Sequence, residues 1–122
     1  MESKHSIFKS FGFAFEGFKV AFLKGRNFRI QISIFVLAII LGIVFGIKQS
    51  EWLDIFLIGS IVLILELINT SLESIVDLVS PEIHPKAKIA KDVAAGAVLI
   101  AAVISTIIGA FIFLPKILGL FA

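Results

Sequence analysis

Two long stretches of this chain carry no ionisable side chain, and they restrict the fold more than any other feature. The first covers residues 30–47 (IQISIFVLAIILGIVFGI) and the second covers residues 93–115 (VAAGAVLIAAVISTIIGAFIFLP). A helix of about 20 apolar residues is long enough to cross the hydrocarbon core of a bilayer. The chain has 122 residues, 59% of them hydrophobic, and so small a globule has too little interior to hide them from water. The sequence therefore predicts an integral membrane protein.

A third apolar stretch, residues 55–79, differs from the first two because it contains Glu66, Glu73 and Asp77. We interpret it as a further spanning helix. No small-residue cleavage site follows the first stretch, so none of the three is expected to be a cleavable signal. The chain is therefore predicted to form a single all-α membrane domain over residues 1–122, with three transmembrane helices.

The N-terminal segment, residues 3–25, has a different pattern. Phenylalanines recur in it at the helical spacing of three and four: Phe8, Phe11, Phe15, Phe18 and Phe22. Charged side chains such as Lys9 and Lys19 fall between them. This pattern predicts an amphipathic helix that lies on the membrane surface. A helix packed against the spans fits the same spacing.

The positively charged side chains predict how the spans are oriented. The connection at 48–54 and the C-terminal tail each carry one Lys or Arg, and the connection at 80–92 carries three. Six more precede the first span: Lys4, Lys9, Lys19, Lys24, Arg26 and Arg29. Cytoplasmic segments carry an excess of Lys and Arg. We therefore expect the N-terminus and the 80–92 connection in the cytoplasm. The net charge of +2 is too small to indicate nucleic-acid binding.

The polar residues of the 55–79 stretch share one face of the predicted helix. Because each residue advances by about 100°, Asn69, Glu73 and Asp77 fall within about 60° of Glu66. A single acid at the membrane centre costs about 2.5–3.5 kcal/mol to insert, so this row is not expected to face lipid. Hydrogen bonds between helices are one explanation. A site for Mg²⁺, which prefers oxygen ligands, is the other.

The connection that follows the acidic face combines acids and bases. The segment SPEIHPKAKIAKD contains Glu82, His84, Lys86, Lys88, Lys91 and Asp92. Pro81 and Pro85 are expected to end the helix and fix a tight turn. Ammonium groups for phosphate oxygens and carboxylates for a metal ion are what a metal–triphosphate complex needs. A P-loop is absent from the sequence, and the lysines also fit the bias of cytoplasmic loops alone.

These blocks of sequence resemble the prokaryotic diacylglycerol kinases, a family of small membrane lipid kinases. Residues 66–77 (ELINTSLESIVD) look like the family signature, and residues 84–100 (HPKAKIAKDVAAGAVLI) are similar to its second block. Residues 26–29 (RNFR) also resemble the family pattern before the first span. The resemblance implies a trimeric helical bundle in the bacterial inner membrane, with active sites between subunits. It also implies transfer of the γ-phosphoryl group of ATP, with Mg²⁺, to a lipid alcohol.

The same resemblance implies a role for each matching residue. Glu66 would be the catalytic acid/base at the lipid hydroxyl, with Asn69 beside it, and Glu73 would bind the metal ion and ATP. The remaining ATP contacts would come from Asp77, Glu82, His84, Lys91 and Asp92. The family phosphorylates diacylglycerol or undecaprenol, and the second block looks more like the undecaprenol kinase branch.

Two positions depart from the family pattern. Gly25 stands where members usually carry a glutamate that is a second metal ligand, and Ser6 stands where some carry an arginine that helps to hold ATP. Three consequences of the missing glutamate are open. Glu73 holds the ion together with phosphates and water, another acid such as Glu82 replaces the missing ligand, or the kinase activity is weak. The alternatives to an active kinase are a degenerate kinase subunit and a non-catalytic membrane oligomer that lines a cation or proton pathway.

Overall fold

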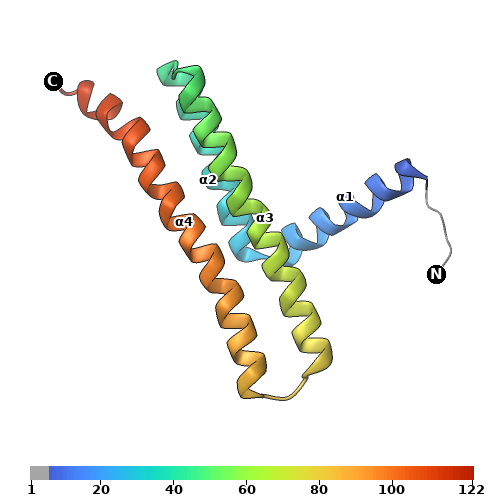
Figure 1. The fold of residues 1–122 in the computed structure, drawn as a ribbon. Helices are drawn as coiled ribbons and strands as arrows, with labels where there is room; N and C mark the ends of the chain where they lie inside the picture. Colours follow the sequence, from blue (N-terminus) through green and yellow to red (C-terminus); the bar gives the residue numbers. More distant parts are fainter. Residues whose placement is uncertain (1–5) are drawn as a thin grey trace.

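The structure is a computed structural model, which describes residues 6–122 (Figure 1). Regular structure in this range is entirely helical and comprises α1 (Ile7–Lys24), α2 (Arg26–Phe45), α3 (Gln49–Val79) and α4 (Pro85–Gly119). The prediction of an all-α chain is confirmed. By length and composition, α2, α3 and α4 are three candidate membrane spans, as predicted. Positions 3–5 of the expected N-terminal helix lie outside the described residues.

The ends of the helices follow from local chemistry rather than from the limits of the uncharged runs. α2 stops at Phe45, short of the expected end at 47, because Gly46 adopts a left-handed conformation with φ of 58° and ψ of 54°. α4 begins with Pro85, whose missing N–H is not needed at the first position of a helix. The ring of His84 caps this helix, since its Nδ1 accepts a hydrogen bond from the main-chain N–H of Lys86 at 3.1 Å.

The helices are arranged around α3. α2 and α4 both pack along α3, which is antiparallel to each of them, and α3 and α4 continue well past the start of α2 (Figure 1). α1 leaves the bundle at the start of α2 and projects to one side (Figure 1). The turn between α3 and α4 and the arm formed by α1 therefore stand apart from the packed part of the bundle.

The apolar core lies at the end of the bundle opposite the α3–α4 turn. Its buried members are Ile47, Ile55, Ile112 and Phe113. Two glycines bring the helices close together there. A Cβ atom on Gly42 would lie 2.6 Å from the ring of Trp52, and one on Gly59 would lie 2.5 Å from the ring of Phe35. This close packing fixes α2 against α3.

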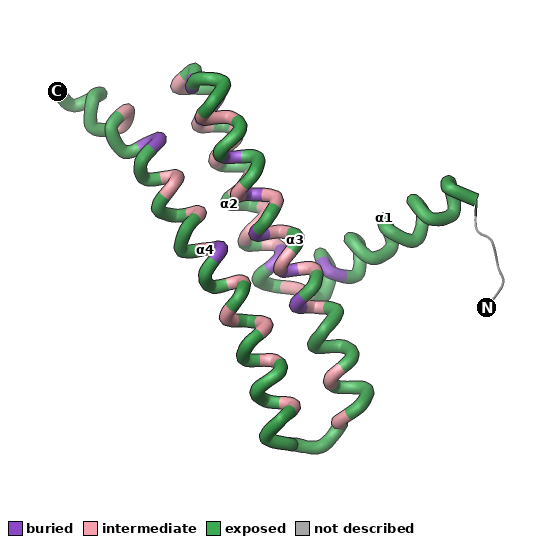
Figure 2. The backbone as a smooth tube through the Cα atoms, in the orientation of Figure 1, coloured by how far each residue is buried: buried purple, intermediate pink, exposed green. Residues whose placement is uncertain are grey.

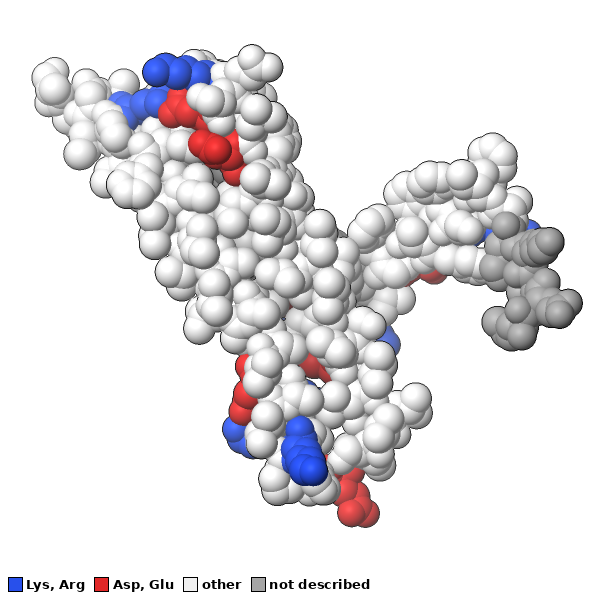
Figure 3. Space-filling model, in the orientation of Figure 1, with Lys and Arg blue, Asp and Glu red and all other residues white. Residues whose placement is uncertain are grey.

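Charged side chains gather at the two ends of the bundle and leave an uncharged band between them (Figure 3). At the end near the core, Lys116 Nζ donates to Glu51 Oε2 at 3.1 Å. At the other end lie the acids and lysines around the α3–α4 turn (Figure 3). With three helices long and apolar enough to span, the chain is a multi-pass membrane protein.

Candidate functional site

The acidic row predicted on the 55–79 stretch lies along α3, but its members have two different surroundings. Glu66 and Asn69 are buried, with exposed fractions of 4% and 7%. Glu73 and Asp77 are exposed. The change occurs where α3 passes the point at which α1 joins α2 (Figure 2). The row therefore runs from a covered polar pair to an open polar end of the same helix.

The covered pair has unsatisfied oxygen atoms. Asn69 Nδ2 donates to Glu73 Oε1 at 2.8 Å, a bond within α3. Among the described residues, Glu66 Oε2 and Asn69 Oδ1 are buried and have no hydrogen-bond partner. A buried polar group without a partner costs about 1–3 kcal/mol. Within the described residues, these oxygens do not form the bonds between helices that the simpler explanation of the row requires.

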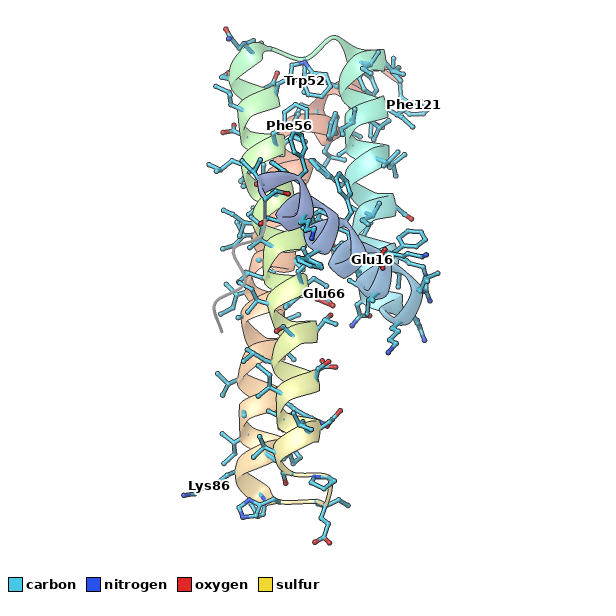
Figure 4. The ribbon with its side chains drawn as sticks, turned by 90° about the vertical axis from the view of Figure 1, so that its right-hand side faces the viewer. Glu16, Trp52, Phe56, Glu66, Lys86 and Phe121 are labelled. Atoms are coloured by element: carbon cyan, nitrogen blue, oxygen red, sulfur yellow. The ribbon has the colours of Figure 1, made fainter. Side chains whose placement is uncertain are left out.

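An apolar crevice lies between α1 and α3, and its α3 wall consists of sequence neighbours of the covered pair, since neither Glu66 nor Asn69 lines it. It has a volume of about 530 Å³ and is lined by Ala14, Glu16, Gly17, Phe18, Val20, Ala21, Leu67, Thr70 and Ser71. Thr70 Oγ1 donates to the main-chain oxygen of Glu66 at 3.0 Å, which ties the crevice wall to that residue. Figure 4 shows Glu66 and Glu16 at a similar level along α3. We call this space the α1–α3 crevice; the sequence did not predict it, because helical spacing says nothing about the angle of α1.

A second crevice, of about 300 Å³, lies at the α3–α4 turn, and we call it the turn crevice. It brings together all five residues that were predicted to contact ATP in addition to Glu73: Asp77, Glu82, His84, Lys91 and Asp92. Two ion pairs lie in this crevice. Lys91 Nζ contacts the Asp77 carboxylate, which joins α4 to α3. Lys88 Nζ lies 2.5 Å from Asp92 Oδ2.

Lys88 lines the turn crevice but was not among the predicted site residues. The sequence feature that could have identified Lys88 is its spacing of four from Asp92, because side chains four residues apart are neighbours on the surface of a helix. Both side chains are largely exposed, at 74% and 61%. The pair is therefore accessible, and the ammonium group of Lys88 can exchange the Asp92 carboxylate for another anion.

The predicted metal ligand, Glu73, lies on α3 between the two crevices. Among the described residues, no group of three or more His, Cys, Asp or Glu side chains is arranged to hold a metal ion. Mg²⁺ usually keeps several waters and binds one or two carboxylates together with substrate phosphates. The exposed carboxylate of Glu73 therefore fits an ion that arrives with ATP rather than one held in a protein cage.

The two positions that depart from the family pattern have local structural roles. Ser6 caps α1, because its Oγ accepts from the main-chain N–H of Lys9 at 3.3 Å. Gly25 separates α1 from α2 in a tight joint. A Cβ atom on Gly25 would lie 2.6 Å from the main-chain oxygen of Ala21 and 3.2 Å from the Cβ of Phe28. A side chain at position 25 is compatible with this joint only if the joint shifts.

Comparison with known proteins agrees with the predicted family. Residues 12–113 match the family described as prokaryotic diacylglycerol kinase. Undecaprenol kinase of Bacillus subtilis (strain 168) is 44% identical over 111 residues, which cover 91% of this chain and 90% of that protein. Diacylglycerol kinase of Synechocystis sp. is 42% identical over 116 residues, which cover 94% of this chain and 66% of that protein. Diacylglycerol kinase of Escherichia coli (strain K12) is 30% identical over 109 residues, which cover 83% of each protein. The chain belongs to the prokaryotic diacylglycerol kinase family and is a lipid kinase.

Proposed function

We propose that this lipid kinase transfers the γ-phosphoryl group of ATP to undecaprenol, and that Glu66 is its general base. One observation carries the proposal: Glu66 is a buried carboxylate on a candidate membrane span, with an oxygen that lacks a partner among the described residues, and the next residue, Leu67, lines the apolar α1–α3 crevice. An ionisable group inside a membrane is costly and is usually functional. A lipid hydroxyl that passes from this crevice to the neighbouring Glu66 would give the carboxylate the donor that it lacks.

In the proposed reaction, the lipid hydroxyl oxygen attacks the γ-phosphorus of ATP. A bond forms between that oxygen and the phosphorus, the bond from the phosphorus to the ADP oxygen breaks, and Glu66 takes the hydroxyl proton. Asn69 Nδ2 holds Glu73 in place through their 2.8 Å hydrogen bond. The burial of Glu66 and Asn69 keeps bulk water away from the base, which favours transfer to the lipid over hydrolysis.

We propose that the triphosphate binds at the turn crevice. Lys91 and Lys88 would exchange their carboxylate partners for phosphate oxygens, since ammonium groups form charge-assisted hydrogen bonds with either. The other predicted contacts would come from Asp77, Glu82, His84 and Asp92, which line the same crevice. Glu73 would hold Mg²⁺, which neutralises charge on the transferred phosphoryl group.

The lining of the α1–α3 crevice supports undecaprenol as the acceptor. Its members are mainly apolar or small, with Glu16, Thr70 and Ser71 as the polar exceptions. A polyprenol is hydrocarbon apart from its hydroxyl group, whereas diacylglycerol also brings two ester groups that need polar partners. Diacylglycerol is the second candidate acceptor, because a relative named diacylglycerol kinase is 42% identical to this chain.

We further propose a homotrimer in the bacterial inner membrane, with α1 on the membrane surface and the turn crevice in the cytoplasm. The distribution of Lys and Arg supports this orientation. The trimer is supported by Glu73, whose exposed carboxylate lies on a spanning helix and needs protein rather than lipid around it. A neighbouring subunit on this face would cover Glu73 and complete the site.

The test is a phosphorylation assay with ³²P-labelled ATP, Mg²⁺ and both lipid alcohols in the same bilayers. We expect faster transfer to undecaprenol than to diacylglycerol, and almost none with Glu66→Gln. Glu51→Gln is the matched control, since it removes a carboxylate from the opposite end of α3. Faster transfer to diacylglycerol would overturn the proposed acceptor, and full activity of Glu66→Gln would overturn the proposed base.

A further inference from the structure

Arg29 reaches back across the break between α1 and α2. Its Nη1 atom donates to the main-chain oxygen of Phe22 at 2.7 Å and to that of Leu23 at 3.0 Å. Both oxygens belong to the last turn of α1. The last carbonyls of a helix have no partner within that helix, and a cation beside them also interacts favourably with the helix dipole. Arg29 therefore caps the C-terminal end of α1 from within α2.

This cap belongs to a compact joint formed by Ala21, Gly25, Phe28 and Arg29. The main-chain N–H of Gly25 donates to the oxygen of Ala21 at 2.7 Å. Ala21 and Phe28 are buried at the same place, with exposed fractions of 2% and 5%. The rest of α1 is exposed (Figure 2). The direction of α1 therefore depends on this joint more than on contacts along its length.

The direction of α1 determines the width of the α1–α3 crevice. One wall consists of α1 residues such as Ala14, Gly17 and Phe18, and the other consists of α3 residues such as Leu67 and Thr70. A small rotation about the joint moves the α1 wall as a rigid body, because α1 is a continuous helix from Ile7 to Lys24. The opening along Leu67 and Thr70, which are close to Glu66 in the sequence of α3, would widen or close with that rotation.

We propose that Arg29 is a positioning residue for the lipid alcohol: by capping α1 it fixes the angle of that helix and hence the width of the α1–α3 crevice. The proposal rests on the function proposed above for that crevice. Arg29 acts through α1 and contacts neither reactant. Its loss is therefore expected to weaken lipid binding while the chemical step and ATP binding change little.

The kinetic test uses the full-length chain in bilayers, with Arg29→Gln and Arg29→Lys. Loss of charge-assisted hydrogen bonds typically changes an equilibrium constant by about tenfold. We therefore expect Arg29→Gln to raise the KM for undecaprenol by about tenfold. We expect kcat and the KM for ATP to stay within about twofold of the unmodified chain. Arg29→Lys should recover part of the loss, because its ammonium group can still reach one carbonyl. Arg26→Gln, an exposed arginine at the start of the same helix, is the matched control.

A distance measurement tests the angle of α1 without relying on activity. The chain has no cysteine, so spin labels can be attached to Ser10→Cys on α1 and Gln49→Cys on α3, with unlabelled chain added to dilute contacts between subunits. We expect the distance distribution to shift or broaden with Arg29→Gln and to change less with Arg29→Lys. It should stay unchanged with Arg26→Gln.

An unchanged distance distribution in Arg29→Gln, or a fall in kcat with an unchanged KM for lipid, would overturn the proposal. If Arg29→Gln does not insert into bilayers, Arg29→Lys provides the same comparison with the charge retained. An unmodified chain that phosphorylates neither lipid would instead overturn the proposed function. The distance measurement would then still decide whether Arg29 sets the angle of α1.

Discussion

Glu51 and Glu66 are both on α3, and their surroundings differ as expected for a structural acid and for the general base that we propose. Glu51 is fully engaged: its Oε1 accepts from the main-chain N–H of Lys48 at 3.0 Å, and its Oε2 accepts from Lys116 Nζ at 3.1 Å. Glu66 is more deeply buried, yet its Oε2 has no partner among the described residues. An acid that stabilises a fold finds its donors within the chain, whereas one that receives a substrate proton must remain available.

The largest expected effect is on catalysis at Glu66. Because a general base typically contributes about 10²–10⁴-fold, we expect Glu66→Gln to lower kcat by about that factor. The amide keeps the size of the side chain and removes the basic oxygen, so the protein should still fold. Thermal unfolding in detergent checks folding, and the lipid kinase assay gives kcat. A kcat within a few-fold of the unmodified chain would mean that Glu66 does not differ from Glu51 in function.

The next largest effect is expected at the turn crevice. Lys91 pairs with Asp77 across this crevice, and we expect Lys91→Gln to raise the KM for ATP by about tenfold, as for the loss of a charge-assisted hydrogen bond. Titration of ATP at saturating lipid measures this KM. Lys86→Gln is the matched control, because Lys86 is an exposed lysine of the same turn that does not line the crevice. Equal effects of the two substitutions would indicate general attraction by positive charge.

A smaller effect is expected at Gly25. Adding side-chain atoms where there is no space typically destabilises a protein by about 1–3 kcal/mol. Gly25→Ala and Gly25→Glu should therefore both shift the α1–α2 joint and lower the rate of transfer by a similar factor of a few-fold. Gly12→Ala is the control, since a Cβ atom there meets nothing within 4 Å. Initial rates under identical conditions compare the three. A rate for Gly25→Glu above that of the unmodified chain would show that a carboxylate is missing from the metal site.

The smallest effect on activity is expected at the structural acid. Glu51→Gln weakens the ion pair with Lys116 and should lower the free energy of unfolding slightly, without changing either KM. Thermal unfolding measures the loss, with Asp54→Asn, an exposed acid on the same helix, as the control. A large loss of kcat at constant stability would remove the distinction between Glu51 and Glu66.

Much of this organisation could be predicted from the sequence because it depends on local periodicity. Two uncharged runs and one apolar stretch with acids located the spans, and the 100° advance per residue placed Glu66, Asn69 and Glu73 on one face of α3. The family was recognised from two blocks of sequence, and the match over residues 12–113 confirms it. The roles of the individual site residues stay predictions.

The contacts that join separate helices could not be predicted in the same way. The pair between Lys91 and Asp77 depends on how the α3–α4 turn folds back, which neither helix specifies by itself. The cap from Arg29 to Phe22 crosses a break in the helical repeat at Gly25, so periodicity does not indicate it. The α1–α3 crevice depends on the resulting angle.

The most direct test of the central claim is to observe the Glu66 carboxyl group while the lipid alcohol binds. Solid-state NMR of the ¹³C-glutamate-labelled chain in bilayers reports each carboxyl group, and Glu66→Gln and Glu51→Gln assign the two signals. Addition of undecaprenol with a non-hydrolysable ATP analogue is expected to shift the Glu66 signal and leave the Glu51 signal unchanged. An unchanged Glu66 signal at saturating lipid would contradict a role for this carboxylate at the lipid hydroxyl.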